Sequence, residues 1–138
     1  MNAGGFIGYC SSNVKIIDCF SEGKLRSEIA KTTGGFIGYL ASENNTIENS
    51  YSTFDVEGTD DVGGFIGRVA STSTGLSIIG CRASGSLFGQ NRIGGFIGYL
   101  EGAGRVNISD CFAEVKVTGM RNNIGGFIGQ INGMVKNS

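Results

Sequence analysis

Two sets of residues in this chain could support chemistry: the glycines of a repeated Gly-Gly-Phe-Ile-Gly pentapeptide and four cysteines. The pentapeptide occurs five times, at 4–8, 34–38, 63–67, 94–98 and 125–129. Glycine-rich segments bind phosphate when they open a helix, as in G-x-G-x-x-G or G-x-x-x-x-G-K-[ST]. No helical periodicity follows the glycines here, and no Lys-Ser or Lys-Thr pair completes such a motif. We therefore interpret the pentapeptide as structural.

The cysteines do not follow the Cys-x-x-Cys spacing of zinc sites. Cys10 replaces aliphatic residues at its repeat position and is interpreted as a small core residue. Cys19, Cys81 and Cys111 share another repeat position with Ser50. If Cys81 and Cys111 lie on adjacent coils, their Cα atoms are about 4.8 Å apart, which permits a disulfide. Stacked neighbours often point their sulfur atoms in parallel, however, and we expect free, buried thiols.

Composition excludes several classes of function. The sequence contains no histidine, so imidazole acid–base chemistry and zinc–histidine sites are excluded. The net charge of −1 gives no basic surface for nucleic acid. No apolar run approaches the roughly 18 residues of a transmembrane helix.

Calcium binding by β-rolls uses G-G-x-G-x-D-x repeats. Here Tyr, Arg or Gln follows the pentapeptide instead. The acidic residues Glu57, Asp60 and Asp61 occur in one turn only, which we interpret as solvated. We therefore expect no metal ion, no cofactor and no catalytic residue.

The pentapeptides recur at intervals of 30, 29, 31 and 31 residues. Self-similarity at a fixed period of about 20 to 50 residues indicates a solenoid, propeller or array. A second block follows each of the first four pentapeptides and begins at Ile16, Ile47, Ile78 and Ile108. We predict a single repeat domain over 1–138, with units 4–33, 34–62, 63–93 and 94–124 and a partial unit 125–138.

Each unit reads as two or three short strands. β-Branched and aromatic residues fill these segments, and Gly, Asn, Asp and Ser separate them. A propeller blade needs about 40 to 50 residues, which is longer than this repeat. We predict an all-β fold, a β-solenoid (β-helix) of four full coils plus a partial fifth, with about 30 residues per coil.

Three columns of equivalent residues are predicted to form the core. The residue after the pentapeptide varies among Tyr, Arg and Gln, whereas the next is always apolar. Alternation along a strand then turns the phenylalanine of the pentapeptide inward. The predicted core stack consists of Phe6, Phe36, Phe65, Phe96 and Phe127, of Ile16, Ile47, Ile78 and Ile108, and of Leu25, Val56, Leu87 and Val117.

The isoleucine of the pentapeptide leaves two alternatives open. Strict alternation puts it on the outer face, where an apolar stripe would bind a partner or a second layer. A bulge or corner at the glycines would instead let Phe and Ile both reach the core. The possible binding face consists of Tyr9, Tyr39, Tyr99, Ile7, Ile37, Ile66, Ile97 and Ile128.

Two further columns are informative. Asp18, Asn49, Gly80 and Asp110 share a position typical of turns, where short polar side chains bond the local backbone. Arg68 and Arg82 depart from the residue types of their columns, both in the third unit. A functional site that interrupts the repeat would be sought at these arginines.

The unit resembles the GLUG-motif repeat, which is found in bacterial surface proteins, including adhesin-like proteins and regions of IgA-specific metallopeptidases. The clearest copy runs from Ile47 through Asn49, Ser50 and Tyr51 to Ser52, followed by Val56 and Gly58. The sequence as a whole departs from the family pattern in having Phe where Leu is usual and Cys where Ser is usual. The resemblance implies a non-catalytic rod, extracellular or on the bacterial cell surface. The metallopeptidase activity does not carry over, because a His-Glu-x-x-His site needs histidine.

The segment 135–138 matches 47–50, so the fifth unit is partial. An uncovered coil presents unpaired strand edges. Either the chain is an excerpt of a longer array, or the next subunit completes the coil and builds a head-to-tail filament.

We therefore expect a stalk or adhesive scaffold with homotypic end-to-end or lateral association. One alternative is a glycan-binding module that uses the tyrosine row, with a surface glycan or host protein as its partner. A carbohydrate-active β-helix enzyme is the third possibility.

Overall fold

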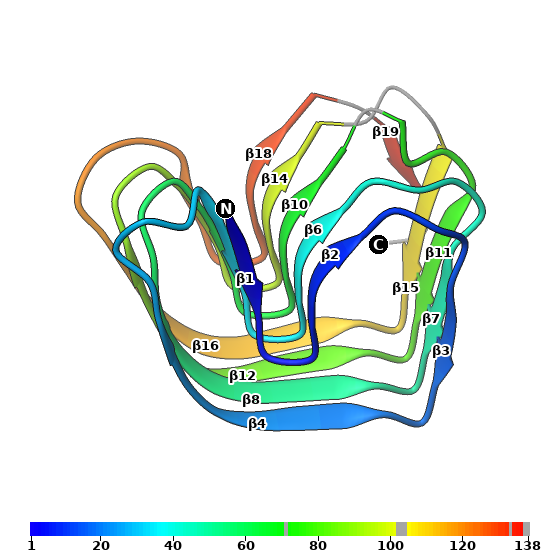
Figure 1. The fold of residues 1–138 in the computed structure, drawn as a ribbon, viewed down its shortest axis with the longest axis horizontal. Helices are drawn as coiled ribbons and strands as arrows, with labels where there is room; N and C mark the ends of the chain where they lie inside the picture. The colour runs from blue at the N-terminus through cyan, green and yellow to red at the C-terminus, as the bar shows by residue number, and fades with distance from the viewer. Residues whose placement is uncertain (71, 102–104, 133, 137–138) are drawn as a thin grey trace.

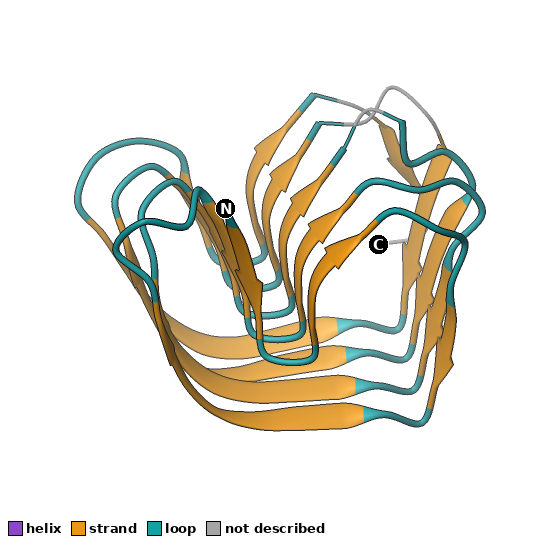
Figure 2. Cartoon of the chain, in the orientation of Figure 1, coloured by secondary structure: helices purple, strands orange, loops and turns teal. Residues whose placement is uncertain are grey.

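The computed structural model of the chain describes residues 1–70, 72–101, 105–132 and 134–136. Every regular element in these residues is a β-strand, and the strands stack in parallel from one coil to the next (Figures 1 and 2). The chain is a β-solenoid of about four turns with roughly 31 residues per turn. The predicted fold class is therefore confirmed.

The strands form four parallel sheets, one along each side of the coil. Sheet A contains β1 (Asn2–Gly4), β5 (Thr32–Gly34), β9 (Asp61–Gly63), β13 (Arg92–Gly94) and β17 (Ile124–Gly125). Sheet B contains β2 (Ile7–Cys10), β6 (Ile37–Leu40), β10 (Ile66–Val69), β14 (Ile97–Leu100) and β18 (Ile128–Ile131). Sheet C contains β3 (Lys15–Ile17), β7 (Thr46–Glu48), β11 (Leu76–Ile79), β15 (Arg105–Ser109) and β19 (Met134–Lys136). Sheet D contains β4 (Phe20–Arg26), β8 (Tyr51–Glu57), β12 (Arg82–Gly89) and β16 (Phe112–Gly119).

The coil is indented at the pentapeptide. In Figure 1, β1 descends into the middle of the coil, the chain turns at the base of β1, and β2 rises away from it. The tip of this bend lies against sheet D, where the hydroxyl of Ser21 donates to the carbonyl of Gly35 at 3.0 Å. A Cβ atom on Gly64 would likewise lie 3.1 Å from the Cβ of Ala83. The bend therefore divides the interior into two lobes.

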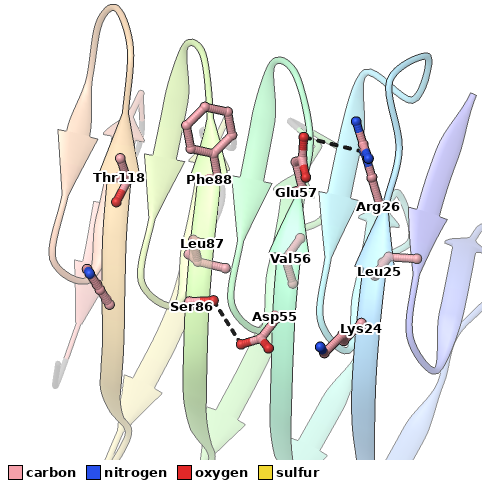
Figure 3. Close-up of a pocket in the computed structure, with 11 residues that line it drawn as sticks. Lys24, Leu25, Arg26, Asp55, Val56, Glu57, Ser86, Leu87, Phe88 and Thr118 are labelled. Atoms are coloured by element: carbon pink, nitrogen blue, oxygen red, sulfur yellow. Dashed lines mark hydrogen bonds and ion pairs between the residues drawn. The ribbon is translucent and has the colours of Figure 1, made fainter.

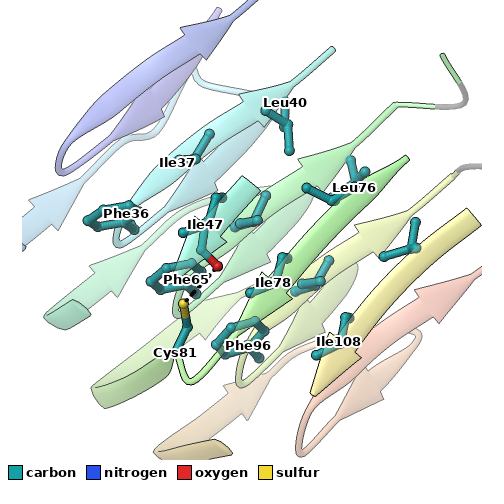
Figure 4. Packing of buried hydrophobic residues seen from close by; sticks show 14 of the residues in the cluster. Phe36, Ile37, Leu40, Ile47, Phe65, Leu76, Ile78, Cys81, Phe96 and Ile108 are labelled. Atoms are coloured by element: carbon teal, nitrogen blue, oxygen red, sulfur yellow. Dashed lines mark hydrogen bonds between the residues drawn. The ribbon is translucent and has the colours of Figure 1, made fainter. Parts of the chain in front are cut away.

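Each lobe has its own hydrophobic core. The larger core lies between sheets B, C and D, and Figure 4 shows Phe36, Phe65 and Phe96 in it beside Ile47 and Ile78. The smaller core lies between sheets A and D, and contains Phe54, Val56, Val62, Leu87 and Ile93. Two columns that were predicted as one core, the phenylalanines and the Leu/Val column, therefore lie on opposite sides of the bend.

The phenylalanine column forms a continuous stack. Successive ring centroids lie 4.7 to 4.9 Å apart with interplanar angles below 10°. Phe36, Phe65 and Phe96 are fully buried. Phe6, by contrast, is 47% exposed, because only Phe36 stacks against it.

The isoleucines of the pentapeptide point into the core, so they do not belong to an outward binding face. Ile37, Ile66 and Ile97 are fully buried, and Ile7 and Ile128 pack against the same cluster. The cause is a bulge at the bend: the N–H groups of Phe36 and Ile37 both donate to the carbonyl of Phe65, each at 2.9 Å. Two successive donors on one acceptor interrupt the alternation of the strand, as expected for a bulge.

The third glycine of the pentapeptide lets sheets A and B approach each other. A Cβ atom on Gly67 would lie 2.6 Å from the carbonyl oxygen of Gly38 and 2.7 Å from the backbone nitrogen of Thr33. No side chain fits between these backbones. The repeated glycine is therefore required by a close approach of two sheets and not by a ligand.

Left-handed backbone forms the corner between sheets C and D. Asp18, Asn49, Gly80 and Asp110 have φ angles of 54°, 48°, 64° and 53°. Asn, Asp and Gly tolerate this region better than other residues, which explains the residue types of the column. In each coil, this corner leads from the strand of sheet C into the long strand of sheet D.

Candidate functional site

A group of charged and aromatic side chains lies between sheets A and B. We call this group the polar notch: Asp61 and Arg92 from sheet A, and Tyr39, Arg68, Tyr99 and Glu101 from sheet B and its following loop. Asp61 and Arg92 begin strands of sheet A, and the bend places them opposite Arg68 in sheet B. Arg68 is one of the two arginines that interrupt the repeat.

Asp61 is the centre of the polar notch. Its side chain is 1% exposed, and Oδ1 accepts a hydrogen bond from Nε of Arg92. A terminal guanidinium nitrogen of Arg68 lies 3.6 Å from Oδ2. Burial raises the pKa of Asp61, and the contacts with Arg92 and Arg68 oppose that rise. The interpretation of this residue as part of a solvated turn was therefore wrong.

Arg68 connects Asp61 to two further groups. Its Nε and a terminal nitrogen donate to Oε2 of Glu101 at 3.1 and 2.6 Å. Its guanidinium carbon lies 5.5 Å from the ring centre of Tyr39 and 5.2 Å from that of Tyr99, at the distance of cation–π contacts. The positive charges of two arginines therefore balance the negative charges of two carboxylates in the polar notch. The ion pair between Arg68 and Asp61 connects sheet B to sheet A.

The predicted tyrosine row is not an open binding face. Tyr99 is only 7% exposed, because Arg92 covers its ring at 4.4 Å and Asn132 donates to its hydroxyl at 2.8 Å. Tyr39 is half-buried, and Tyr9 alone is 54% exposed. Arginine side chains therefore cover the rings of Tyr39 and Tyr99, and the hydroxyl of Tyr99 already has a hydrogen-bond partner.

A second aromatic column lies on the outer face of sheet D and was missed as a site by sequence reasoning. Phe20 stacks on Tyr51 with ring centres 5.1 Å apart, and the guanidinium of Arg82 lies 4.7 Å above Tyr51. Phe20 and Phe112 are 54% and 47% exposed. A depression of about 270 Å³ opens beside Tyr51, Arg82 and Phe112. The signal was present in the sequence, as an aromatic column broken by Arg82.

A larger depression of about 390 Å³ lies at the far end of sheet D (Figure 3). Its charged rim includes the ion pair between Arg26 and Glu57 at 3.5 Å, and the hydroxyl of Ser86 donates to Asp55 at 2.8 Å. Phe88 is 40% exposed at the same place. The mixture of charges and one apolar ring is typical of a solvated surface groove.

The four cysteines are free. Cys10 and Cys81 are buried, and Cys19 and Cys111 are half-buried. Cys81 and Cys111 lie next to each other on adjacent coils, as the repeat predicted: the backbone N–H of Cys81 donates to Sγ of Cys111 at 3.4 Å.

Coils that pair in register through four parallel sheets define the chain as a β-solenoid repeat protein. Among protein families, the GLUG motif matches residues 89–118, which span β13, β14, β15 and most of β16. The match covers one coil of the stack, and over these residues it confirms the resemblance to that family. No curated protein and no solved structure matches the chain. Among the residues that the structure describes, no helix has the length and apolar character needed to cross a membrane.

Proposed function

We propose that the chain is a non-catalytic structural module of a bacterial secreted or cell-surface protein, in which stacked coils form a stalk or an adhesive scaffold. The observation that carries this proposal is the continuous pairing of all four sheets. Ile7, Ile37, Ile66, Ile97 and Ile128 follow one another in register through sheet B. A scaffold needs this kind of repetition, because each coil offers its neighbour the same edge.

We further propose end-to-end association, and the same geometry supports it. Among the described residues, the outermost strand at each end of every sheet has a neighbour on one side only. Apolar side chains are exposed at both ends of the stack, notably Phe6 at 47%, Ile124 at 47% and Ile131 at 46%. Unpaired strand edges readily accept another strand. A second copy that places β2 on β18 would continue sheet B in the existing register.

The test is sedimentation velocity over a concentration series, with two matched substitutions in the first coil. Phe6→Lys places a charge on the end of the stack, whereas Phe20→Lys places one on the outer face of sheet D, where Phe20 is 54% exposed. We expect assemblies that grow with concentration, that are lost in Phe6→Lys and that persist in Phe20→Lys. A strict monomer at every concentration contradicts end-to-end association.

A second candidate function, glycan binding, is favoured by the aromatic column on sheet D. Phe20, Tyr51 and Phe112 offer apolar ring surface next to the hydrogen-bond donors of Arg82, a combination that suits an amphipathic ligand such as a sugar ring. Glycan-array binding should be lost in Phe112→Ala and kept in Tyr9→Ala. Binding that depends on Tyr9 instead would place the glycan at the exposed end of the tyrosine row.

A further inference from the structure

The pair Cys81 and Cys111 has a geometry that suits reversible covalent chemistry. Each cysteine directly precedes a strand of sheet D, and those strands pair residue for residue, Arg82 with Phe112. Adjacent in-register strands are about 4.8 Å apart, which falls inside the Cα separation of about 4.4 to 6.8 Å that a disulfide needs. The backbones are therefore already spaced for a bond between the two sulfur atoms.

The hydrogen bonds show how the two thiols are oriented. Sγ of Cys111 lies 3.4 Å from the backbone nitrogen of Cys81 and 3.5 Å from the carbonyl oxygen of Ile78, so it leans toward the preceding coil. Sγ of Cys81 leans the same way, toward the carbonyl of Ile47 at 3.5 Å. The thiols are parallel. Rotation of the Cys81 side chain to another staggered rotamer would turn its sulfur toward Cys111.

The two thiols differ in reactivity. The interaction with the Cys81 thiol, together with the hydrogen bond from the Cys81 backbone N–H, lowers the pKa of Cys111, while burial and nearby Asp110 oppose that shift. The pKa of Cys81 is raised by the interaction with Cys111 and by burial. Cys111 is also the more accessible of the two. Since the thiolate is the attacking species, Cys111 is the group that meets an oxidant from solution.

We propose that Cys81 and Cys111 form a dithiol that low-molecular-weight disulfides oxidise to a covalent link between the third and fourth coils. The thiolate of Cys111 attacks one sulfur of the disulfide RSSR, the S–S bond breaks, and one RS⁻ leaves and takes up a proton from water. Cys81 then loses its proton to water and attacks the sulfur of Cys111, which expels the second RS⁻, and this thiolate also takes up a proton from water. The cysteines lose two electrons and RSSR is reduced to two RSH. This inference is independent of the proposed function.

Serine variants are suitable probes because serine already occupies the same column. Ser50 accepts from the N–H of Cys19 at 3.2 Å and donates to the carbonyl of Glu48 at 2.8 Å. Cys111 makes the equivalent contacts with Cys81 and with the carbonyl of Ser109. We therefore expect Cys81→Ser and Cys111→Ser to fold.

The experiment treats the purified chain with glutathione disulfide, followed by alkylation, intact mass measurement and peptide mapping. The wild type should lose two alkylatable thiols and about 2 Da, with one peptide pair linking Cys81 to Cys111. Cys81→Ser should stop at a glutathione adduct on Cys111, and Cys19→Ser should behave like the wild type. The link should raise the Tm by roughly 5 °C, and dithiothreitol should reverse the rise.

Three results would overturn the proposal. All four thiols of the wild type could remain alkylatable after the treatment. The link could join other cysteines or two separate chains. A stable glutathione adduct on Cys111 in the wild type, without closure onto Cys81, would show that the Cys81 side chain does not turn.

Discussion

Asp61 carries its carboxylate in a position where the side chain is 1% exposed, with Arg92 and Arg68 against it. Isolated charges are costly to bury, and they persist in proteins when they are paired and hydrogen-bonded. Arg68 occupies the position that tyrosine holds in the coils on either side. Arg68, which differs from the tyrosines at the equivalent positions in the sequence, is thus an ion-pair partner of the buried Asp61.

Removal of that acid should cost stability. We expect Asp61→Ala to lower the free energy of unfolding by about 2 to 3 kcal/mol, somewhat less than for a fully buried pair, because both arginines retain contact with solvent. The exposed Asp55 provides the control, and Asp55→Ala should change the same free energy by less than about 0.5 kcal/mol. Urea unfolding followed by circular dichroism measures both. Equal effects would mean that the polar notch does not fasten the sheets.

The pH dependence of stability reports on the same carboxyl group. Burial raises its folded-state pKa above the ordinary value of 3.8, so the folded chain binds this proton more tightly than the unfolded chain. The stability advantage of the wild type over Asp61→Asn should be largest below pH 3.8 and should fall as the pH rises through the raised pKa. Urea titrations between acidic and neutral pH test this. An advantage that grows with pH would mean that the arginines outweigh burial.

At the scale of the element, the pentapeptide works as a bulged bend between two closely packed sheets. The bulge at Phe36 and Ile37 turns both side chains into the core. The glycines on either side permit backbone-to-backbone contact between sheets A and B. Because the bend serves the same role in each coil, the five letters recur together.

Two glycines of one column differ in their surroundings and provide a matched test of this role. A Cβ on Gly67 would meet backbone atoms of Gly38 and Thr33 at 2.6 to 2.8 Å. A Cβ on Gly8 would meet only the carbonyl oxygen of Asn2, at an ordinary 3.5 Å. Gly67→Ala should therefore lower the free energy of unfolding by at least about 2 kcal/mol, whereas Gly8→Ala should change it by less than about 0.5 kcal/mol. Similar values in chemical unfolding would show that the sheets can separate without cost.

At the scale of the whole molecule, stability is expected to vary along the stack. Coils in a solenoid contact only their neighbours, so each outer coil packs against one coil and each central coil packs against two. Phe65 is fully buried, and its counterpart Phe6 in the first coil is 47% exposed. Local opening should therefore start at the ends.

Hydrogen exchange can measure this gradient with equivalent amides. The N–H groups of Ile7 and Ile66 each donate to a phenylalanine carbonyl at 2.9 Å, so they differ mainly in the coil that holds them. We expect the amide of Ile66 to exchange at least about tenfold more slowly, by mass spectrometry or NMR. Equal rates in a dilute sample would indicate that the chain opens only as one unit.

Much of the architecture could be predicted from the spacing of residues. The period of the pentapeptide, together with its β-branched and aromatic content, indicated a solenoid, and the structure has one. The column of Asp18, Asn49, Gly80 and Asp110 indicated a corner, where the backbone is left-handed. The position of the polar notch could not be predicted, because Asp61, Arg68 and Glu101 come from different coils and meet only after the pentapeptide bends inward.

The sequence by itself determined the repeat, the strand content, the stacking of equivalent residues and the pairing of Cys81 with Cys111 on adjacent coils. Each of these depends on periodicity, and parallel in-register stacking turns a period along the chain into a neighbour in space. The tertiary structure decided which way the pentapeptide isoleucines point and which tyrosines remain accessible. Those properties depend on the bulge and on the contact between sheets A and B. Both features bring together residues that are not equivalent positions of the repeat, so the repeat period does not predict their contacts.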